Sequence, residues 1–99
     1  MVKLNEPLIK QLQASGAITT NGKAGVLHKV FVMGDTAGDS VAVLDGATEK
    51  IRVLIPTDLI PVTVDFPSGS RPIFTTDIDV TITTSNTVFA TFVYEEIAQ

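Results

Sequence analysis

The stretch "DIDVTITTSNTVFATFVYEE", residues 77–96, holds two runs of alternating apolar and polar residues around a polar break. A period of two is typical of half-buried β-strands, because successive side chains point to opposite faces of a sheet. The residues "TSN" at 84–86 are typical of a turn. We therefore interpret the stretch as a β-hairpin that forms one wall of a core. Its inward residues would be Ile78, Val80, Ile82, Val88, Ala90, Phe92 and Tyr94.

The same alternation recurs through most of the chain after Gly25. Further strands are predicted at residues 26–33, 40–45, 50–55 and 62–66, with a short edge strand within 71–76, where Pro72 limits pairing. Seven or eight short strands, with a turn roughly every ten residues, are typical of a β-sandwich or jelly roll. We expect an all-β fold in a single small domain.

The bulk composition narrows the class of protein. A chain of 99 residues that is 44% hydrophobic and 18% charged fits one globular domain. It contains no cysteine, which excludes disulfides and thiolate metal sites. A net charge of −4 with seven basic residues argues against nucleic acid as a partner. No signal-peptide pattern or apolar run of ~20 residues is visible, so we expect synthesis in a cytoplasm and no membrane partner.

Residues 1–23 follow a different pattern from the rest. Leu4, Leu8, Ile9 and Leu12 recur at helical spacing, and Gly16 follows them, which predicts a short helix. Such a helix is marginal in water unless it packs on its own domain or on a neighbouring molecule. The following Asn21–Gly22 is a turn signal and suggests a hinge. We therefore divide the chain into an N-terminal arm or short helix with a hinge (1–23) and a β-sandwich domain (24–99).

Some strands are apolar on both faces, which predicts a covering partner. In residues 26–33 the alternation places Leu27, Phe31 and Met33 on the face opposite Val30, and in 87–96 it places Phe89 and Val93 on the second face. One face of each sheet in a small sandwich is normally solvated, so a partner subunit or the N-terminal arm would cover these residues. Simple exposure is the alternative, since scattered surface apolar residues are common.

No set of residues predicts a catalytic centre. His28, the only histidine, has no serine in a nucleophile-elbow motif nearby and is interpreted as a packed or interface residue. Asp35 and Asp39 flank Gly38, where calcium is the one candidate cofactor and a solvated turn is the alternative. Asp77 and Asp79 share a strand face, and we interpret them as a guard against stray edge pairing rather than as an acid–base pair.

The strand sequences resemble small β-sandwich virion proteins of tailed bacteriophages. The likeness covers residues 24–96, and at one point it departs from the family, which often has glycine where this chain has Asp77. The matching positions are Gly25, Leu27, His28, Val41, Leu44, Asp45, Gly46, Pro67, Ile73, Phe74, Ile78, Val80, Thr81, Val88 and Tyr94.

The resemblance implies a non-enzymatic structural protein located in the virion. It would decorate or cement the capsid by binding the major capsid protein or other virion proteins, as a symmetric homo-oligomer such as a trimer. A tail- or fibre-associated module that binds a host receptor or glycan is the alternative, although the chain has no tryptophan and one tyrosine to stack on sugars. A small hydrolase is a third hypothesis. The predicted partner-binding residues are Leu4, Leu8, Ile9, Leu12, Phe89 and Val93.

Overall fold

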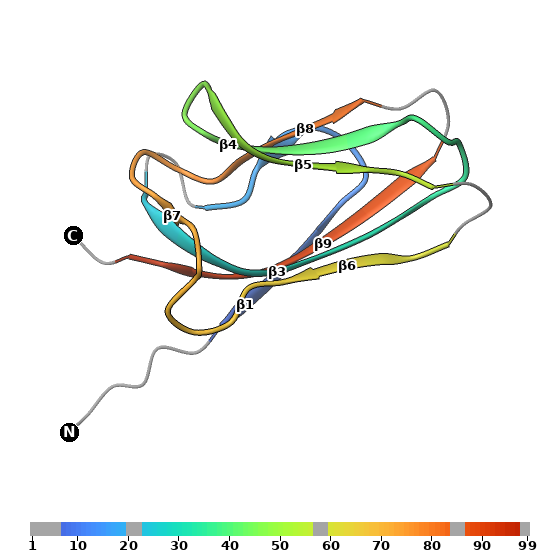
Figure 1. Ribbon diagram of the computed structural model, residues 1–99. Coiled ribbons are helices and arrows are strands. Elements are labelled where there is room, and N and C mark those ends of the chain that lie inside the picture. The colour runs from blue at the N-terminus through green and yellow to red at the C-terminus, as the bar shows by residue number, and fades with distance from the viewer. Residues whose placement is uncertain (1–6, 20–22, 57–59, 84–86, 98–99) are drawn as a thin grey trace.

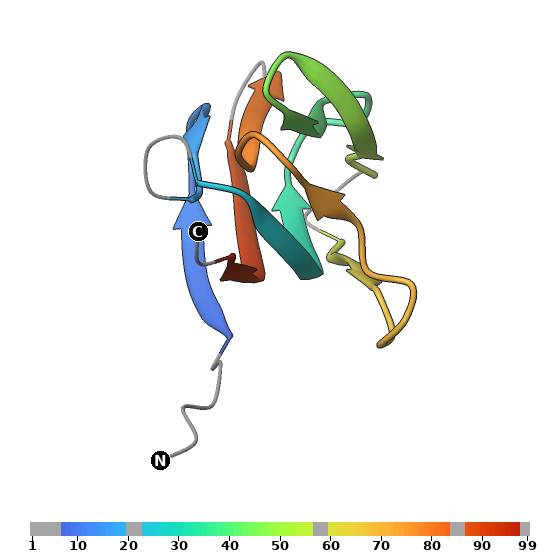
Figure 2. The ribbon, with the colours of Figure 1, turned by 90° about the vertical axis from the view of Figure 1, so that its left-hand side faces the viewer.

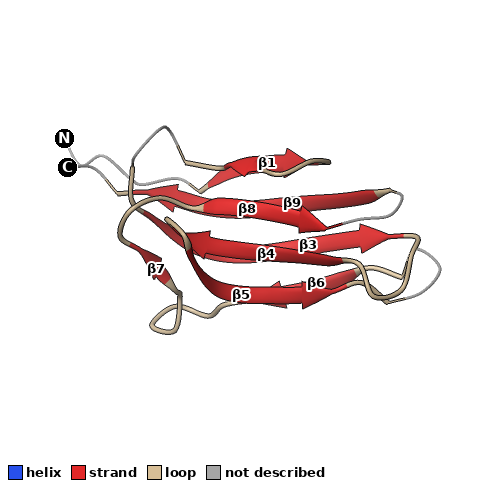
Figure 3. Ribbon diagram, turned by 90° about the horizontal axis from the view of Figure 1, so that it is seen from above, coloured by secondary structure: helices blue, strands red, loops and turns tan. Residues whose placement is uncertain are grey.

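The computed structural model describes residues 7–19, 23–56, 60–83 and 87–97. Within these ranges the chain forms β-strands and no helix, and the strands make two antiparallel sheets that face each other (Figure 1). Seen from above, the strands of the two sheets run in nearly the same direction (Figure 3), which is the arrangement of an aligned sandwich. The predicted all-β sandwich is confirmed.

The first sheet, called here the β3–β9 sheet, is long and has β9 and β3 at its centre. Its strands, in spatial order, are β1 (Leu8–Leu12), β9 (Val88–Glu96), β3 (Gly25–Gly34) and β6 (Val62–Asp65), with β7 (Ile73–Phe74) also paired to β3. The second sheet, called the β4–β8 sheet, covers it. Its strands, in order, are β2 (Gly16–Ala17), β8 (Asp79–Thr83), β4 (Ser40–Asp45) and β5 (Thr48–Leu54).

The hairpin predicted for residues 77–96 is wrong. Strand β8 pairs with β4, where Val80 lies opposite Val43, whereas β9 pairs with β3, where Phe92 lies opposite Val30. The chain therefore passes from one sheet to the other between β8 and β9, and residues 84–86 lie outside the described residues. Alternation fixes which side chains face the core, but it does not specify which strand lies alongside.

The core wall predicted from these two strands is largely confirmed. Its residues on β8 and β9 point between the sheets, and all but one are buried; Ile82 is half-buried and packs against the others. The largest fully buried side chains nearby are Phe74 and Phe92. The residues that line the core are those predicted for the hairpin. The residues of β8 and those of β9 lie in different sheets, however, and face each other across the core.

The helix predicted near the N-terminus is wrong over Leu8–Leu12, which forms strand β1. This strand pairs with β9, with Leu8 opposite Tyr94 and Leu12 opposite Ala90. Leu8 and Leu12 share a face in either conformation, so their spacing does not distinguish helix from strand. Pairing with β9 satisfies backbone groups that a helix this short leaves unpaired. Leu4 lies outside the described residues.

A β-bulge in β3 changes which residues face the core. The register between β3 and β9 shifts between Leu27 and Lys29, so the extra residue at His28 interrupts the alternation. Leu27 is 0% exposed, and it shares the core side with Val30 and Val32. The prediction that Leu27 lies on the same face as Phe31 is therefore wrong, although the two residues are an even number of positions apart.

Candidate functional site

The outer face of the β3–β9 sheet is the candidate functional site. Strand β9 sends Ala90, Phe92 and Tyr94 into the core, so its alternate residues Phe89 and Val93 point away from the second sheet. Residues opposite each other in paired strands share a face, and the registers of β1, β3 and β6 therefore define the neighbours of these two side chains.

Three rows of side chains cross this outer face. The first contains Ile9, Val93, Lys29 and Asp65 in order from β1 to β6. The second contains Gln11, Thr91, Phe31 and Thr63, and the third contains Phe89 and Met33. Five apolar side chains thus gather on one solvent-facing sheet surface, and we call them the outer-face cluster: Ile9, Phe31, Met33, Phe89 and Val93.

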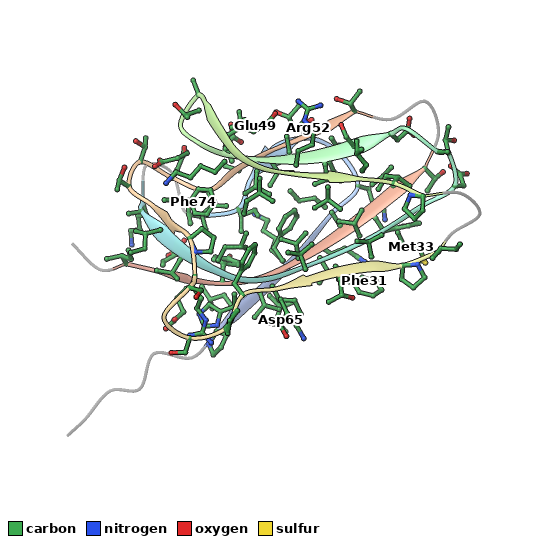
Figure 4. All side chains as sticks on the ribbon, in the orientation of Figure 1. Phe31, Met33, Glu49, Arg52, Asp65 and Phe74 are labelled. Carbon is green, nitrogen blue, oxygen red and sulfur yellow. The ribbon has the colours of Figure 1, made fainter. Side chains whose placement is uncertain are left out.

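The outer-face cluster is accessible to solvent. Ile9 is 73% exposed and Phe31 is 37% exposed, whereas Met33, Phe89 and Val93 are half-buried against their neighbours. Phe31 lies on the side of its sheet that faces away from the buried Phe74 (Figure 4). A partly apolar sheet surface of this kind is suited to contact with another protein.

Charged side chains border the cluster. Lys29 Nζ and Asp65 Oδ2 are 4.0 Å apart, and their side chains are 44% and 69% exposed, so this ion pair contributes little to stability. At the end of the face near the bulge, His28 Nε2 lies 2.6 Å from Glu95 Oε2. The His28 side chain is half-buried there and contacts the carboxylate of Glu95.

The structure brings together some of the predicted partner-binding residues and separates others. Ile9, Phe89 and Val93 lie on the outer face, and Ile9 is directly opposite Val93. Leu8 and Leu12 lie on the core side of β1; Leu8 is 44% exposed at the end of the strand, and Leu12 packs against the core. Phe31 joins the site as a residue that the sequence marked as apolar on a second face but not as a binding residue.

The two aspartates considered as a calcium site have different surroundings. Asp35 Oδ1 accepts hydrogen bonds from the Thr87 backbone N–H at 3.3 Å and from Thr36 Oγ1 at 3.2 Å. Asp39 is buried, and its carbonyl accepts a hydrogen bond from the Ile55 N–H at 2.7 Å. Among the residues that the structure describes, no group of three or more His, Cys, Asp or Glu could hold a metal ion. Calcium at Asp35 and Asp39 stays a prediction.

Asp77 and Asp79 do not guard a free edge. Asp79 lies opposite Ala17 of β2, so the edge of β8 is already paired at this point. Its Oδ1 accepts the Val80 N–H at 3.0 Å, and Asp77 Oδ1 accepts the Gly46 N–H at 3.1 Å. The edge-guard interpretation is wrong at Asp79 because β2, from the N-terminal segment, pairs with β8 and covers its edge at this position.

Asp45 forms a second carboxylate contact to the same turns, and the sequence interpretation missed it. Its Oδ2 accepts hydrogen bonds from the Thr75 N–H at 3.0 Å and from the Thr75 hydroxyl at 3.1 Å, and its Oδ1 accepts one from the Thr76 N–H at 2.8 Å. These hydrogen bonds, chiefly those from the two backbone N–H groups, lower the pKa of Asp45 from 3.8 to about 2. The Asp45–Gly46 pair in the sequence predicts the turn, but it does not indicate that Thr75 and Thr76 are the hydrogen-bond partners of Asp45.

Tyr94 closes the core at the junction of the two sheets. Its hydroxyl donates a hydrogen bond to the Ile18 carbonyl at 3.3 Å, and burial raises the pKa of this phenol. The contact fixes the segment after β2 against β9, so the N-terminal residues are tied to both sheets of the sandwich.

Comparisons with known proteins add no family assignment. A scan against protein-family models finds no matching model, and a search of curated proteins finds no match. The likeness of residues 24–96 to phage virion proteins therefore stays a prediction. The described residues include no helix that is long and apolar enough to cross a membrane.

Proposed function

We propose that this chain is a non-enzymatic structural protein of a tailed-bacteriophage virion that decorates the capsid. In this proposal the outer-face cluster binds the major capsid protein and helps to stabilise the shell. The observation that carries the proposal is the set of five apolar side chains on a solvent-facing sheet surface. The sandwich fold is the one that the resemblance implies for such proteins.

The energetics of the face support a binding role. Fully burying an exposed aliphatic or aromatic side chain contributes about 1.5–3 kcal/mol, so burying the parts of Ile9 (73%) and Phe31 (37%) that are still exposed would contribute on the order of 2–3 kcal/mol before ordering costs. Many identical copies on a symmetric shell would strengthen such a contact through avidity. The charged border at Lys29, Asp65 and Glu95 would supply orientation rather than affinity.

The polar side chains considered as candidate sites at His28, Asp35 and Asp77 are engaged in contacts that support the fold, which favours a structural role. His28 contacts Glu95, the Asp35 carboxylate accepts hydrogen bonds from the Thr87 and Thr36 groups, and Asp77 accepts the Gly46 N–H. The net charge of −4 favours a protein partner over nucleic acid. The chain would be made in the host cytoplasm and then join the virion.

Binding of purified protein to expanded capsids of the cognate phage tests this proposal. We expect Phe31→Ser and Ile9→Ser each to weaken binding by about tenfold or more, because each removes buried apolar area at the contact. Leu54→Ser is the matched control, since Leu54 is 62% exposed on the opposite sheet and should leave binding unchanged. Equal binding by all three variants would overturn the assignment to this face.

Related binding and activity assays distinguish the capsid role from the tail or fibre module and from the hydrolase. Failure of the wild-type protein to bind capsids, together with binding to purified tails or to a glycan array, would favour the tail or fibre module. Turnover of an ester or glycoside that is lost in His28→Ala would favour the hydrolase hypothesis. Circular dichroism of each variant establishes that the sandwich is folded in every comparison.

A further inference from the structure

Strand β1 forms an open edge of the β3–β9 sheet. One side of β1 pairs with β9, and no strand among the described residues pairs with its other side. Figure 2 shows β1 as the outermost strand beside β9. The free N–H and C=O groups of such an edge are a template for another strand.

The other edges of the two sheets are protected more fully than β1. Strand β6 is four residues long, lies between Pro61 and Pro67, and ends at the exposed Asp65. Strand β5 carries exposed charges at Glu49, Lys50 and Arg52, and β2 and β7 are each two residues long. Charges, prolines and short length are the usual protections of sheet edges.

The β1 edge carries one exposed charge, at Lys10, and its other exposed residues are Leu8, Ile9 and Gln11. Its five residues contain no proline, and Leu8 and Ile9 are 44% and 73% exposed. Lys10 is the one charged residue of the strand, and it lies opposite Phe92, on the core side of the sheet. The outer side of the edge therefore presents Ile9 next to Gln11, with no charge between them.

We propose that a second copy of this chain pairs with β1, antiparallel to it, so that Ile9 lies opposite Ile9 of the second copy. The two copies would be related by a twofold axis perpendicular to the sheet, and each would contribute the same edge. This dimer does not depend on the proposed function, because it requires no capsid protein.

Charge and the burial of Ile9 select this register. Pairing centred on Lys10 would place two like charges directly opposite each other, which is destabilising. The registers centred on Ile9 and on Gln11 each pair three residues of β1, but the one centred on Gln11 leaves Ile9 opposite residue 13, outside the strand. Pairing centred on Ile9 instead places Lys10 opposite Leu8 and buries the most exposed apolar side chain of the edge against its own copy.

The dimer would place both functional faces on the same side. A twofold axis perpendicular to the sheet keeps the outer face of each copy outward, so the two β3–β9 sheets become one continuous sheet. The apolar row would run from Val93 through Ile9 into Ile9 and Val93 of the second copy. A partner with repeated sites would then be bound by two faces at once, which raises avidity without any new contact in the monomer.

The size of the contact predicts a reversible dimer. A contact between two such short strands buries less than the ~1,200 Å² of total area that stable complexes usually need. The dimer fraction should therefore rise with protein concentration rather than be complete at all concentrations.

Light scattering during size-exclusion chromatography tests the dimer at low and high protein concentration. We expect the mass to rise with concentration towards twice the 10.5 kDa of one chain, and to remain at one chain in Ile9→Lys. Leu54→Lys is the matched control, because Leu54 is 62% exposed on β5 and should leave the dimer intact. A wild-type protein that stays monomeric at all concentrations, or that forms a trimer, would overturn the proposal.

Cross-linking tests the register itself. The chain contains no cysteine, so Ile9→Cys introduces a single thiol. In the proposed register two such thiols lie directly opposite each other, at a spacing that a disulfide spans. We expect mild oxidation to convert most of Ile9→Cys to a covalent dimer and to leave Leu54→Cys monomeric. Equal cross-linking of the two variants, or none at residue 9 in a protein that dimerises, would overturn the register.

Discussion

At the scale of single residues, Asp45 joins two turns that are 30 residues apart in the sequence. Its carboxylate accepts three hydrogen bonds from Thr75 and Thr76, and Lys50 Nζ lies 3.9 Å from its Oδ2. The side chain thereby ties the β4–β5 turn, in one sheet, to the segment that follows β7, in the other. The contact closes one end of the sandwich.

We expect Asp45→Asn to lower the melting temperature by several degrees. The Thr75 and Thr76 donors contact both carboxylate oxygens of Asp45, whereas an asparagine side chain has one acceptor oxygen. Asp65→Asn is the matched control, since Asp65 is 69% exposed and its recorded partner is Lys29 at 4.0 Å. Differential scanning calorimetry measures both. A loss of stability in Asp65→Asn as large as that in Asp45→Asn would contradict the role of Asp45.

The pH dependence of stability gives an independent check of Asp45. The pKa of this group is lowered from 3.8 to about 2 on folding, so its contribution is fully present above about pH 4 and is lost as the pH falls towards 2. Urea unfolding of wild type and Asp45→Asn between pH 2 and 6 should show a difference that narrows below pH 4. The pKa of Glu49 is also lowered, by the Arg52 hydrogen bond, but this effect is common to both proteins. A difference that stays constant with pH would contradict the assignment.

Two glycines differ in the space around them. A Cβ at Gly25 would lie 2.8 Å from Ile78 Cδ1 and 3.0 Å from the Glu95 carbonyl oxygen, whereas a Cβ at Gly16 would meet nothing within 4 Å. We expect Gly25→Ala to reduce the free energy of unfolding by about 1–3 kcal/mol through overpacking. Gly16→Ala should stay within about 0.5 kcal/mol of wild type. Equal effects in chemical denaturation would show that Gly25 is not in close contact with its neighbours.

At the scale of the elements, the bulge in β3 determines which aromatic and aliphatic side chains are core. Leu27 is 0% exposed and Phe31 is 37% exposed, although simple alternation places both on one face. We expect Leu27→Ala to reduce the free energy of unfolding by about 2–5 kcal/mol, and Phe31→Ala to change it by about 1 kcal/mol or less. A larger loss of unfolding free energy in Phe31→Ala than in Leu27→Ala, measured by denaturant titration, would contradict the position of the bulge.

The strands could be predicted from the sequence more fully than their pairing. Residues 40–45 were predicted as a strand and form β4, and residues 26–33 fall within β3. Alternation makes such segments visible because it reflects burial of one face. Alternation does not indicate which strands are neighbours. It therefore predicts a β8–β9 hairpin, although the two strands lie in different sheets.

The N-terminal strand shows why short segments are ambiguous. Leu8 and Leu12 satisfy both a helical and a strand pattern, and the outcome is decided by the open side of β9, which no local feature of the sequence reveals. The position of β1 in the sheet also argues against a truncation as a test of binding. Deleting residues 1–15 would expose the edge of β9 and destabilise the sandwich, so substitutions at Ile9 are the sharper test of a binding role.

At the scale of the whole molecule, the two outward surfaces of the sandwich differ in character. The β3–β9 sheet presents the outer-face cluster, whereas the β4–β8 sheet carries charged residues such as Glu49 and Arg52, whose side chains lie 2.6 Å apart (Figure 4). This asymmetry gives the molecule one face suited to a protein partner and one suited to solvent.

Part of this face could be predicted from the sequence. Phe89 and Val93 were recognised as apolar residues on a second strand face, and the structure places them there. The position of Ile9, Phe31 and Met33 beside them depends on strand registers. These registers are set by contacts between distant segments, such as Ile9 and Val93 of the β1–β9 pair, which are 84 positions apart. Such long-range pairing has no local signature in the chain.

The copy number of this chain in purified virions tests the central claim most directly. Quantitative mass spectrometry against the major capsid protein would measure it. A capsid decoration protein should be present at on the order of hundreds of copies per particle, because it repeats with the shell. Absence from the virion, or a few to dozens of copies that co-purify with tails, would contradict a role on the capsid.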